Sequence, residues 1–190
     1  NVMSGSSGDV GLFDMQGFGP RPKASDIDWI RMLDLPGAGK FEKARPIGRN
    51  LPAAIFDLPF VADGLHIDGE ELSVEEAKKL PHRNVFRDRF ALELTSGQDM
   101  ARKMGAKVIP APKELSDKGI TKTPLWYYCL HEAEHFGGKL GPVGGGIVAG
   151  TLIRLLALDS ESVLWDDEFQ PWEELGASKA GKYSLGHMAQ

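Results

Sequence analysis

The chain has 190 residues, of which 42% are hydrophobic and 26% charged, a balance typical of one folded domain with its own core. The formal net charge is −5 and no basic run stands out, which argues against nucleic acid as a partner. The longest apolar run, residues 141–153, is rich in glycine and stops at Arg154, so it is too short to span a bilayer.

The N-terminal third contains few regular patterns. Residues 1–25 are rich in Gly, Ser and Pro, and we expect an irregular arm there. The apolar spacing over 26–35 predicts a short helix, and the mixture of apolar clusters and prolines over 51–67 favours short helical turns. We expect a helical body over 26–176, followed by a polar tail at 177–190.

Capping signals predict several helix boundaries in the middle of the chain. Ser73 opens a capping box, so a helix begins there, and Pro81 suits the first turn of the next helix. Ser96, with an acidic residue three positions later, predicts another helix start, and Gly105 predicts the end of that helix. Residues 107–120 are predicted to be a loop with one helical turn.

Two longer helices are predicted near 124–136 and 142–158. Thr123 is a suitable N-cap for the first of them, Pro124 suits its first position, and Gly137 favours its end. No run of alternating polar and apolar residues is long enough to predict a strand. We therefore expect a mainly α fold with little or no β structure.

The first of these helices carries a literal H-E-x-x-H sequence. His131 and His135 are four residues apart and share one helical face, so both can reach a single Zn²⁺, with Glu132 as general base. A catalytic zinc site needs a third protein ligand, and one common extension of the motif would place it at Gly141, which has no side chain to bind metal. The alternative is a helix end whose exposed face carries two histidines.

The second helix begins with a run of glycines. Residues 144–149 formally fit the dinucleotide-binding pattern G-x-G-x-x-A, but that pattern requires a preceding strand, and here a helix precedes it. We favour close packing by small residues, with a buried apolar stripe along the helix. The stripe is predicted to consist of Ile147, Val148, Leu152, Leu155 and Leu156.

Several motifs occur in one order along residues 10–175. They are Ile27-Asp28-Trp29, Leu35-Pro36-Gly37, Asp57-Leu58-Pro59, P-H-R-N-V-F-R-D-R at 81–89, L-T-S-G-Q at 94–98, then Trp126, Glu132, Gly138 and Gly141-Pro142 before an apolar helix and an acidic W-D-D-E. In this order they resemble the C-terminal helical region of an animal-type haem peroxidase of the bacterial type. The resemblance implies the C-terminal part of that fold.

The resemblance implies roles for two residues of the R-N-V-F-R segment. Asn84 stands where the family has an asparagine that hydrogen-bonds the proximal haem histidine, and Arg87 where an arginine pairs with a haem propionate. Glu132 is the family residue of the H-E-x-x-H sequence, whereas His131 and His135 occupy positions that the family does not specify. Without the resemblance, Asn84 would be expected to bond nearby backbone groups and Arg87 to lie on a solvated helix face.

The resemblance further implies H₂O₂-dependent oxidation of a small-molecule reductant at haem b, in a secreted or periplasmic protein. The family's distal histidine, catalytic arginine, proximal histidine and calcium loop lie upstream of this region. None of the five histidines stands where a haem ligand is expected. We therefore expect an N-terminal peroxidase half or chain to complete the enzyme, and this chain to be inactive alone.

Two other hypotheses stand beside a haem peroxidase part: a zinc hydrolase, and a haem-free binding or structural module that kept the fold. An N-terminal partner that carries the distal and proximal histidines would favour catalysis over the module. The sequence leaves the substrate open among halides, phenols and fatty acids.

Overall fold

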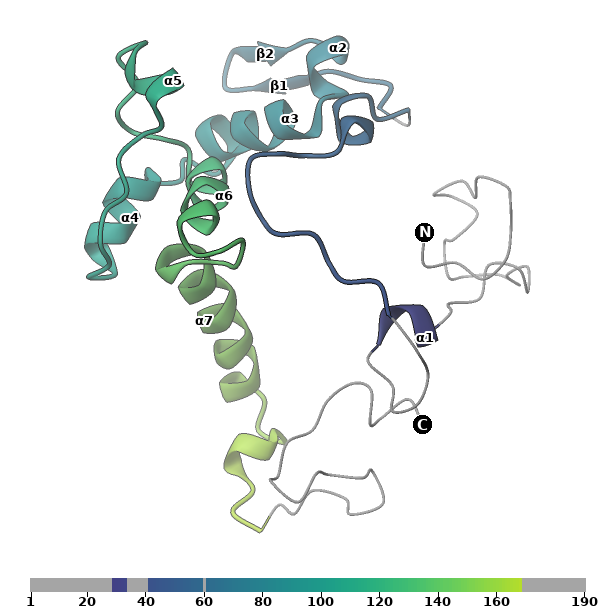
Figure 1. Ribbon diagram of the computed structural model, residues 1–190, viewed down its shortest axis with the longest axis vertical. Coiled ribbons are helices and arrows are strands. Elements are labelled where there is room, and N and C mark those ends of the chain that lie inside the picture. Colours follow the sequence, from purple (N-terminus) through teal and green to yellow (C-terminus); the bar gives the residue numbers. More distant parts are fainter. Residues whose placement is uncertain (1–28, 34–40, 60, 169–190) are drawn as a thin grey trace. The chain divides into compact units, whose positions relative to one another are not determined.

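A computed structural model describes residues 29–33, 41–59 and 61–168 (Figure 1). The chain divides into two compact units, of which the larger is Arg45–Trp165 and the other combines Asn1–Ala44 with Asp166–Gln190. The irregular arm and the polar tail expected from the sequence lie outside the described residues. The larger unit contains every candidate site residue.

In the smaller unit, the described residues form one short helix. It is α1 (Trp29–Met32), which lies within the helix expected over 26–35. The Arg31 guanidinium forms an ion pair with Glu42, and the Glu42 backbone N–H donates to the Arg31 carbonyl at 2.8 Å. Within this unit, residues 29–33 and residues 41–44 are therefore joined by a side-chain and a backbone contact.

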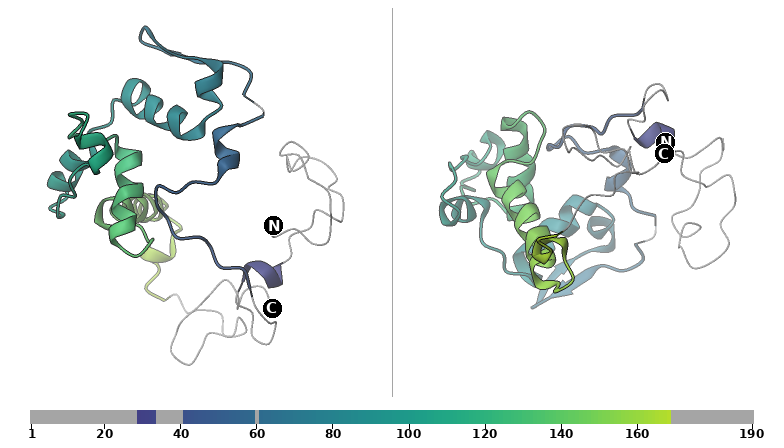
Figure 2. Two further views of the ribbon diagram at one scale, coloured as in Figure 1. Left: turned by 45° about the horizontal axis from the view of Figure 1, so that its top comes forward. Right: turned by 90° about the horizontal axis from the view of Figure 1, so that it is seen from below.

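The described residues of the larger unit are mainly helical, which confirms the mainly α character predicted from the sequence (Figures 1 and 2). Its elements, in chain order, are η3 (Ala53–Phe56), β1 (Leu65–Ile67), β2 (Glu70–Leu72), α2 (Val74–Ala77), α3 (Leu80–Phe86), η4 (Arg87–Ala91), α4 (Gly97–Lys103), α5 (Lys113–Ser116), α6 (Leu125–His135), α7 (Pro142–Leu158) and η5 (Val163–Trp165). The single turn α5 lies in the loop expected over 107–120.

Local capping chemistry sets several of these boundaries, as predicted. The Ser73 hydroxyl accepts from the Glu76 N–H at 3.3 Å before α2, and the Ser96 hydroxyl accepts from the Asp99 N–H at 3.1 Å before α4. Gly105 follows α4 with a φ of 65°, the left-handed conformation that favours glycine after a helix.

A small antiparallel hairpin is the element that the sequence prediction missed. Strand β1 pairs with β2 so that Leu65 faces Leu72 and Ile67 faces Glu70. The connection is Asp68-Gly69, with φ values of 51° and 86°, as a type I′ turn requires. The Asp-Gly pair was the available signal, and the strands were missed because each has only three residues.

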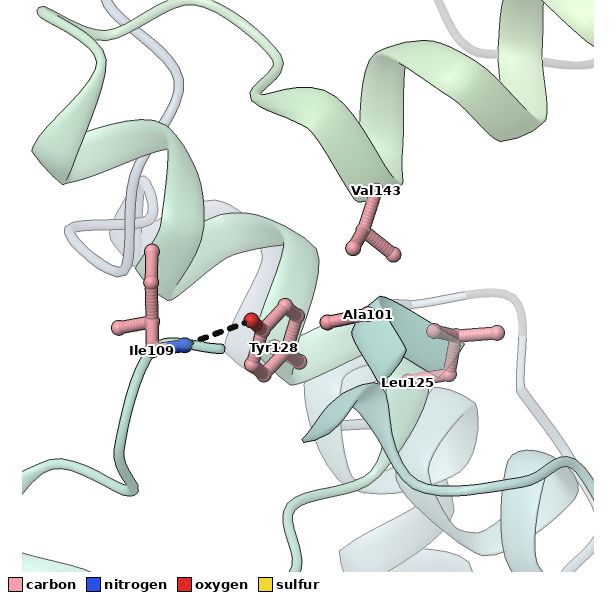
Figure 3. Close-up of a cluster of buried hydrophobic side chains, with 5 residues drawn as sticks. All are labelled: Ala101, Ile109, Leu125, Tyr128 and Val143. Atoms are coloured by element: carbon pink, nitrogen blue, oxygen red, sulfur yellow. Dashed lines mark hydrogen bonds between the residues drawn. The ribbon is translucent and has the colours of Figure 1, made fainter. Parts of the chain in front are cut away.

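The core lies where α4, α6 and α7 meet, and these helices are side by side in Figures 1 and 2. Its buried side chains are Ala101, Ile109, Leu125, Tyr128 and Val143 (Figure 3). Tyr128 is fully buried, and its hydroxyl accepts a hydrogen bond of 3.0 Å from the Ile109 N–H. Gly97 packs against this ring so closely that a Cβ there would lie 1.9 Å from Tyr128 Cγ.

The start of α6 differs from the prediction. Thr123 is buried, but its N–H and hydroxyl both donate to Gln98 Oε1, at 2.9 and 3.2 Å, instead of capping the helix. The cap comes from Asp88, distant in sequence, whose carboxylate accepts from the Trp126 N–H at 2.9 Å. The end of α6 follows the prediction, since Gly137 has a φ of 66°.

The predicted buried stripe of α7 is wrong in the described structure. Val143 and Gly144 are buried and Ile147 half-buried, but Leu152 and Leu155 are 57% and 61% exposed. The reason is geometric, because Figure 1 shows α7 extending beyond its neighbours α4 and α6. Among the described helices, none is long and apolar enough to cross a lipid bilayer.

Candidate functional site

The element η4, which directly follows α3, begins with three consecutive charged residues whose side chains have different surroundings. They are Arg87, Asp88 and Arg89. This element is a π-helical turn, in which the Leu92 N–H donates to the Arg87 carbonyl at 3.0 Å. Asp88 is buried against the start of α6, while Arg87 and Arg89 line two different cavities. Such π-helical turns are rare in proteins overall, and those that occur are often found at functional sites.

The two residues that the resemblance singles out lie on this segment. Asn84 is half-buried on α3, and among the described residues no hydrogen bond involves its side chain. Arg87, three residues later, is exposed and lines a cavity of about 530 Å³ together with Arg83 and Asp63. Within the described part, the Arg87 guanidinium has no ion pair. Asn84 does not line that cavity.

The larger cavity has a volume of about 1020 Å³ and lies on the other side of α3 and η4. Its walls come from α3, η4, α6, the segment before and within η3, strand β2, and the loop around α5. They are formed by Arg49, Leu51, Phe56, Leu72, Pro81, His82, Val85, Phe86, Arg89, Phe90, Leu115, Gly119, Ile120, Thr121, Lys122, Pro124, Trp126, Tyr127 and Leu130. Most of these side chains are apolar, and the charged ones are all basic.

Arg49 forms the centre of an ion-pair cluster at the edge of this cavity. Its backbone N–H and its Nε donate to the two Glu134 oxygens, each at 2.9 Å, and Nη1 pairs with Glu114. Nη1 also lies 3.4 Å from the Tyr127 hydroxyl. Partial burial alone would raise the pKa of Glu134, but the hydrogen bonds from Arg49 and His131 bring this pKa below its ordinary value.

The residues of the H-E-x-x-H sequence have different roles in the structure. Glu132 is fully buried, and its carboxylate accepts from the Val143 N–H at 3.1 Å and from the Gly144 N–H at 3.0 Å. It therefore caps the N-terminus of α7, where unpaired amides and the helix dipole favour a negative charge. Gly141 makes this possible, since a Cβ there would lie 2.5 Å from Glu132 Cδ.

The two histidines of this motif differ in exposure. His131 is buried and its Nδ1 lies 3.5 Å from a Glu134 oxygen, whereas His135 is exposed and its Nδ1 lies 3.1 Å from the His131 carbonyl oxygen. The alternative of a helix end whose exposed face carries both histidines therefore does not hold for His131. The described residues contain no group of three or more His, Cys, Asp or Glu side chains arranged to hold a metal ion.

The glycine run at the start of α7 serves packing. The anion-binding end of the helix is occupied by Glu132, and α6 precedes it where a dinucleotide fold would have a strand. A Cβ at Gly144 would lie 3.3 Å from Cys129 Cβ, and one at Gly146 would lie 2.3 Å from Met104 Cε. Close approach to α4 and α6 accounts for these two glycines.

The roles of Arg49, Asp88 and Arg89 are not predictable from the sequence pattern. Asp88 and Arg89 lie inside a segment that the resemblance singles out, but their roles depend on contacts with α6 and with the larger cavity. Arg49 meets Glu134 across 85 positions of the chain, and no local pattern encodes that pairing. The charged R-D-R triplet was the one available signal.

Comparison of the chain with protein-family models, with curated proteins and with solved structures finds no match.

Proposed function

We propose that this chain is the C-terminal part of a haem peroxidase, completed by an upstream chain that carries the proximal and distal histidines. One observation carries the proposal: Asn84 on α3 and Arg87, three residues later in η4, both have side chains without a hydrogen-bond or ion-pair partner among the described residues. Their backbone is held by the buried Asp88 cap on α6. A half-buried amide and an unpaired guanidinium are available to bond a histidine of an upstream chain and a haem propionate.

The chemistry of these two side chains fits their proposed partners. The Asn84 amide oxygen can accept a hydrogen bond from an imidazole N–H, which fixes the tautomer of an iron ligand. The Arg87 guanidinium, with Arg83 beside it in the smaller cavity, can pair with a carboxylate such as a haem propionate. Haem, when bound, supplies the H₂O₂-dependent oxidation. Asn84 would orient the iron-ligating imidazole, and Arg87 would hold a haem propionate.

Each described histidine has a polar neighbour at one ring nitrogen, and the resemblance places the axial ligand upstream of this chain. His66 lies 3.3 Å from Glu71, His82 contacts Glu76, His131 lies near Glu134, and His135 lies near a backbone carbonyl. The zinc alternative would require Glu132 as general base, and its carboxylate already caps α7. The haem-free module differs from our proposal in its cofactor content.

The test uses the chain carrying an affinity tag, produced in its native cells and purified with whatever it binds. Haem per chain is measured as pyridine haemochrome for the native chain, for Arg87→Gln and for Arg154→Gln, an exposed arginine of α7 that lines neither cavity. We expect Arg87→Gln to lower haem occupancy and Arg154→Gln to leave it unchanged. Equal occupancy in both variants would overturn the role of Arg87, and haem-free native material would favour the module.

Asn84 acts through the iron ligand, so it is a positioning residue and needs a different readout. In Asn84→Leu we expect haem to be retained and its reduction potential to change, because the ligand loses its hydrogen-bond acceptor. An unchanged potential would contradict this role. Asn84→Asp, which keeps an acceptor, separates the lost hydrogen bond from a general disturbance of α3.

A further inference from the structure

The larger cavity is separate from the residues of the proposed haem site. Its apolar walls include Phe86 and Phe90, whose ring centroids are 4.9 Å apart, and Trp126 on α6. Neither Asn84 nor Arg87 lines it. Its volume of about 1020 Å³ is enough for a small organic molecule, since ligand pockets are commonly about 300–1,000 Å³. Aromatic walls favour an apolar body.

The charges at the cavity have one sign. Among the described residues no carboxylate lines it, and its charged side chains are Arg49, Arg89 and Lys122. Glu134 and Glu114 neutralise Arg49, and Asp99 lies 2.9 Å from Lys122 Nζ. Within the described part of the chain, Arg89 is the lining cation that has no ion pair. It stands between Phe86 and Phe90 in sequence, directly beside the aromatic wall.

We propose that this cavity binds a small molecule with an apolar body and a single carboxylate group. Arg89 pairs with the carboxylate, and the walls formed by Phe86, Phe90 and Trp126 contact the apolar body. A guanidinium matches a carboxylate through two parallel hydrogen bonds, and an apolar body is removed from water by the aromatic walls. Charge complementarity selects this ligand over a neutral or cationic one. The inference goes beyond the proposed function and does not depend on haem.

The proposal is tested with three probes that share one alkyl chain: decanoate, decan-1-ol and decyltrimethylammonium. Isothermal titration of the full chain gives stoichiometry and Kd, with the two ionic probes kept below their micellar concentrations and decan-1-ol below its solubility limit. We expect one decanoate per chain, bound about tenfold more tightly than the other two probes, because one charged hydrogen-bonded pair accounts for roughly that factor. Equal affinity for all three would mean that apolar surface alone binds them, and would overturn the proposal.

Substitutions at the wall of the larger cavity show whether the probes bind there. Arg89→Gln should weaken decanoate about tenfold while leaving decan-1-ol unchanged, and Arg154→Gln is the matched control outside the cavity. Val85→Trp, at a half-buried position of the wall, should block both probes by filling the space. Circular dichroism and thermal unfolding identify variants that fold. Decanoate binding that survives both Arg89→Gln and Val85→Trp would overturn the proposal. An absence of decanoate binding to the folded native chain would overturn it as well.

Discussion

The Glu132 carboxylate of α6 accepts a hydrogen bond of 3.0 Å from the Gly144 backbone N–H of α7. This contact joins two helices by using a buried charge as a helix cap, and Val143 donates to the same carboxylate. It gives the central acid of the H-E-x-x-H sequence a structural role. The free energy of unfolding should therefore depend on Glu132.

Removing this cap should destabilise the protein. In Glu132→Ala, the buried N–H groups of Val143 and Gly144 lose their acceptor, and we expect a loss of about 2–4 kcal/mol in the free energy of unfolding. Urea denaturation measures it. Glu161→Ala, an exposed glutamate, is the control and should change stability by less than about 0.5 kcal/mol. Similar losses in both variants would contradict the capping role.

Two glycine substitutions separate close packing from helix propensity. Gly141→Ala places a methyl group 2.5 Å from Glu132 Cδ and should destabilise by about 1–3 kcal/mol. Gly150→Ala, in open space within α7, should stabilise by about 1 kcal/mol because alanine favours helices. Thermal unfolding compares the two. The same sign in both variants would show that the glycines are not distinguished by their contacts.

The Arg49 cluster should make stability sensitive to acid. The folded pKa of Glu134 lies below its ordinary value of 4.5, so its contribution is complete above that pH and is lost as the pH falls through the folded pKa. Arg49→Gln should therefore lower stability most at pH 7 and progressively less toward pH 3. Denaturant titrations at several pH values test this. With Arg154→Gln as control, a pH-independent effect of Arg49→Gln would contradict it.

Cys129 should make stability sensitive to alkali. Burial, and then the charges of Glu132 and Asp88, raise the pKa of the thiol from 9.0 to about 11. Between these pH values the unfolded chain releases the proton that the folded protein retains, so the free energy of unfolding falls as pH rises. Cys129→Ala should reduce this slope. We also expect the Cys129 thiol to react slowly with thiol reagents at pH 8 and to react faster in urea.

Local chemistry accounts for the parts of the fold that were predictable. Ser73 and Ser96 bond amides three residues away, so their signals lie within one short segment. The cap on α6 was predicted wrongly at Thr123 because its actual acceptor, Asp88, comes from another element. Capping by a distant carboxylate leaves no periodic or spaced pattern in the sequence.

One wrong prediction, the buried stripe of α7, and one feature that was not predicted, the larger cavity, have similar causes. The apolar positions of α7 predict burial, yet its second half extends past its neighbours and exposes Leu152 and Leu155. Periodicity indicates which face is apolar and not what covers it. In the candidate site, Asn84 and Arg87 came from a resemblance, whereas the cavity beside Arg89 is assembled by elements far apart in sequence.

The most direct test of the central claim is the metal content of natively purified material, with everything that co-purifies retained. Elemental analysis and the visible absorption spectrum are recorded on the same sample. We expect iron together with a haem absorption band, at one haem per chain. Zinc at one ion per chain, without iron, would contradict the haem peroxidase proposal and would make His131 and His135 the candidate zinc ligands.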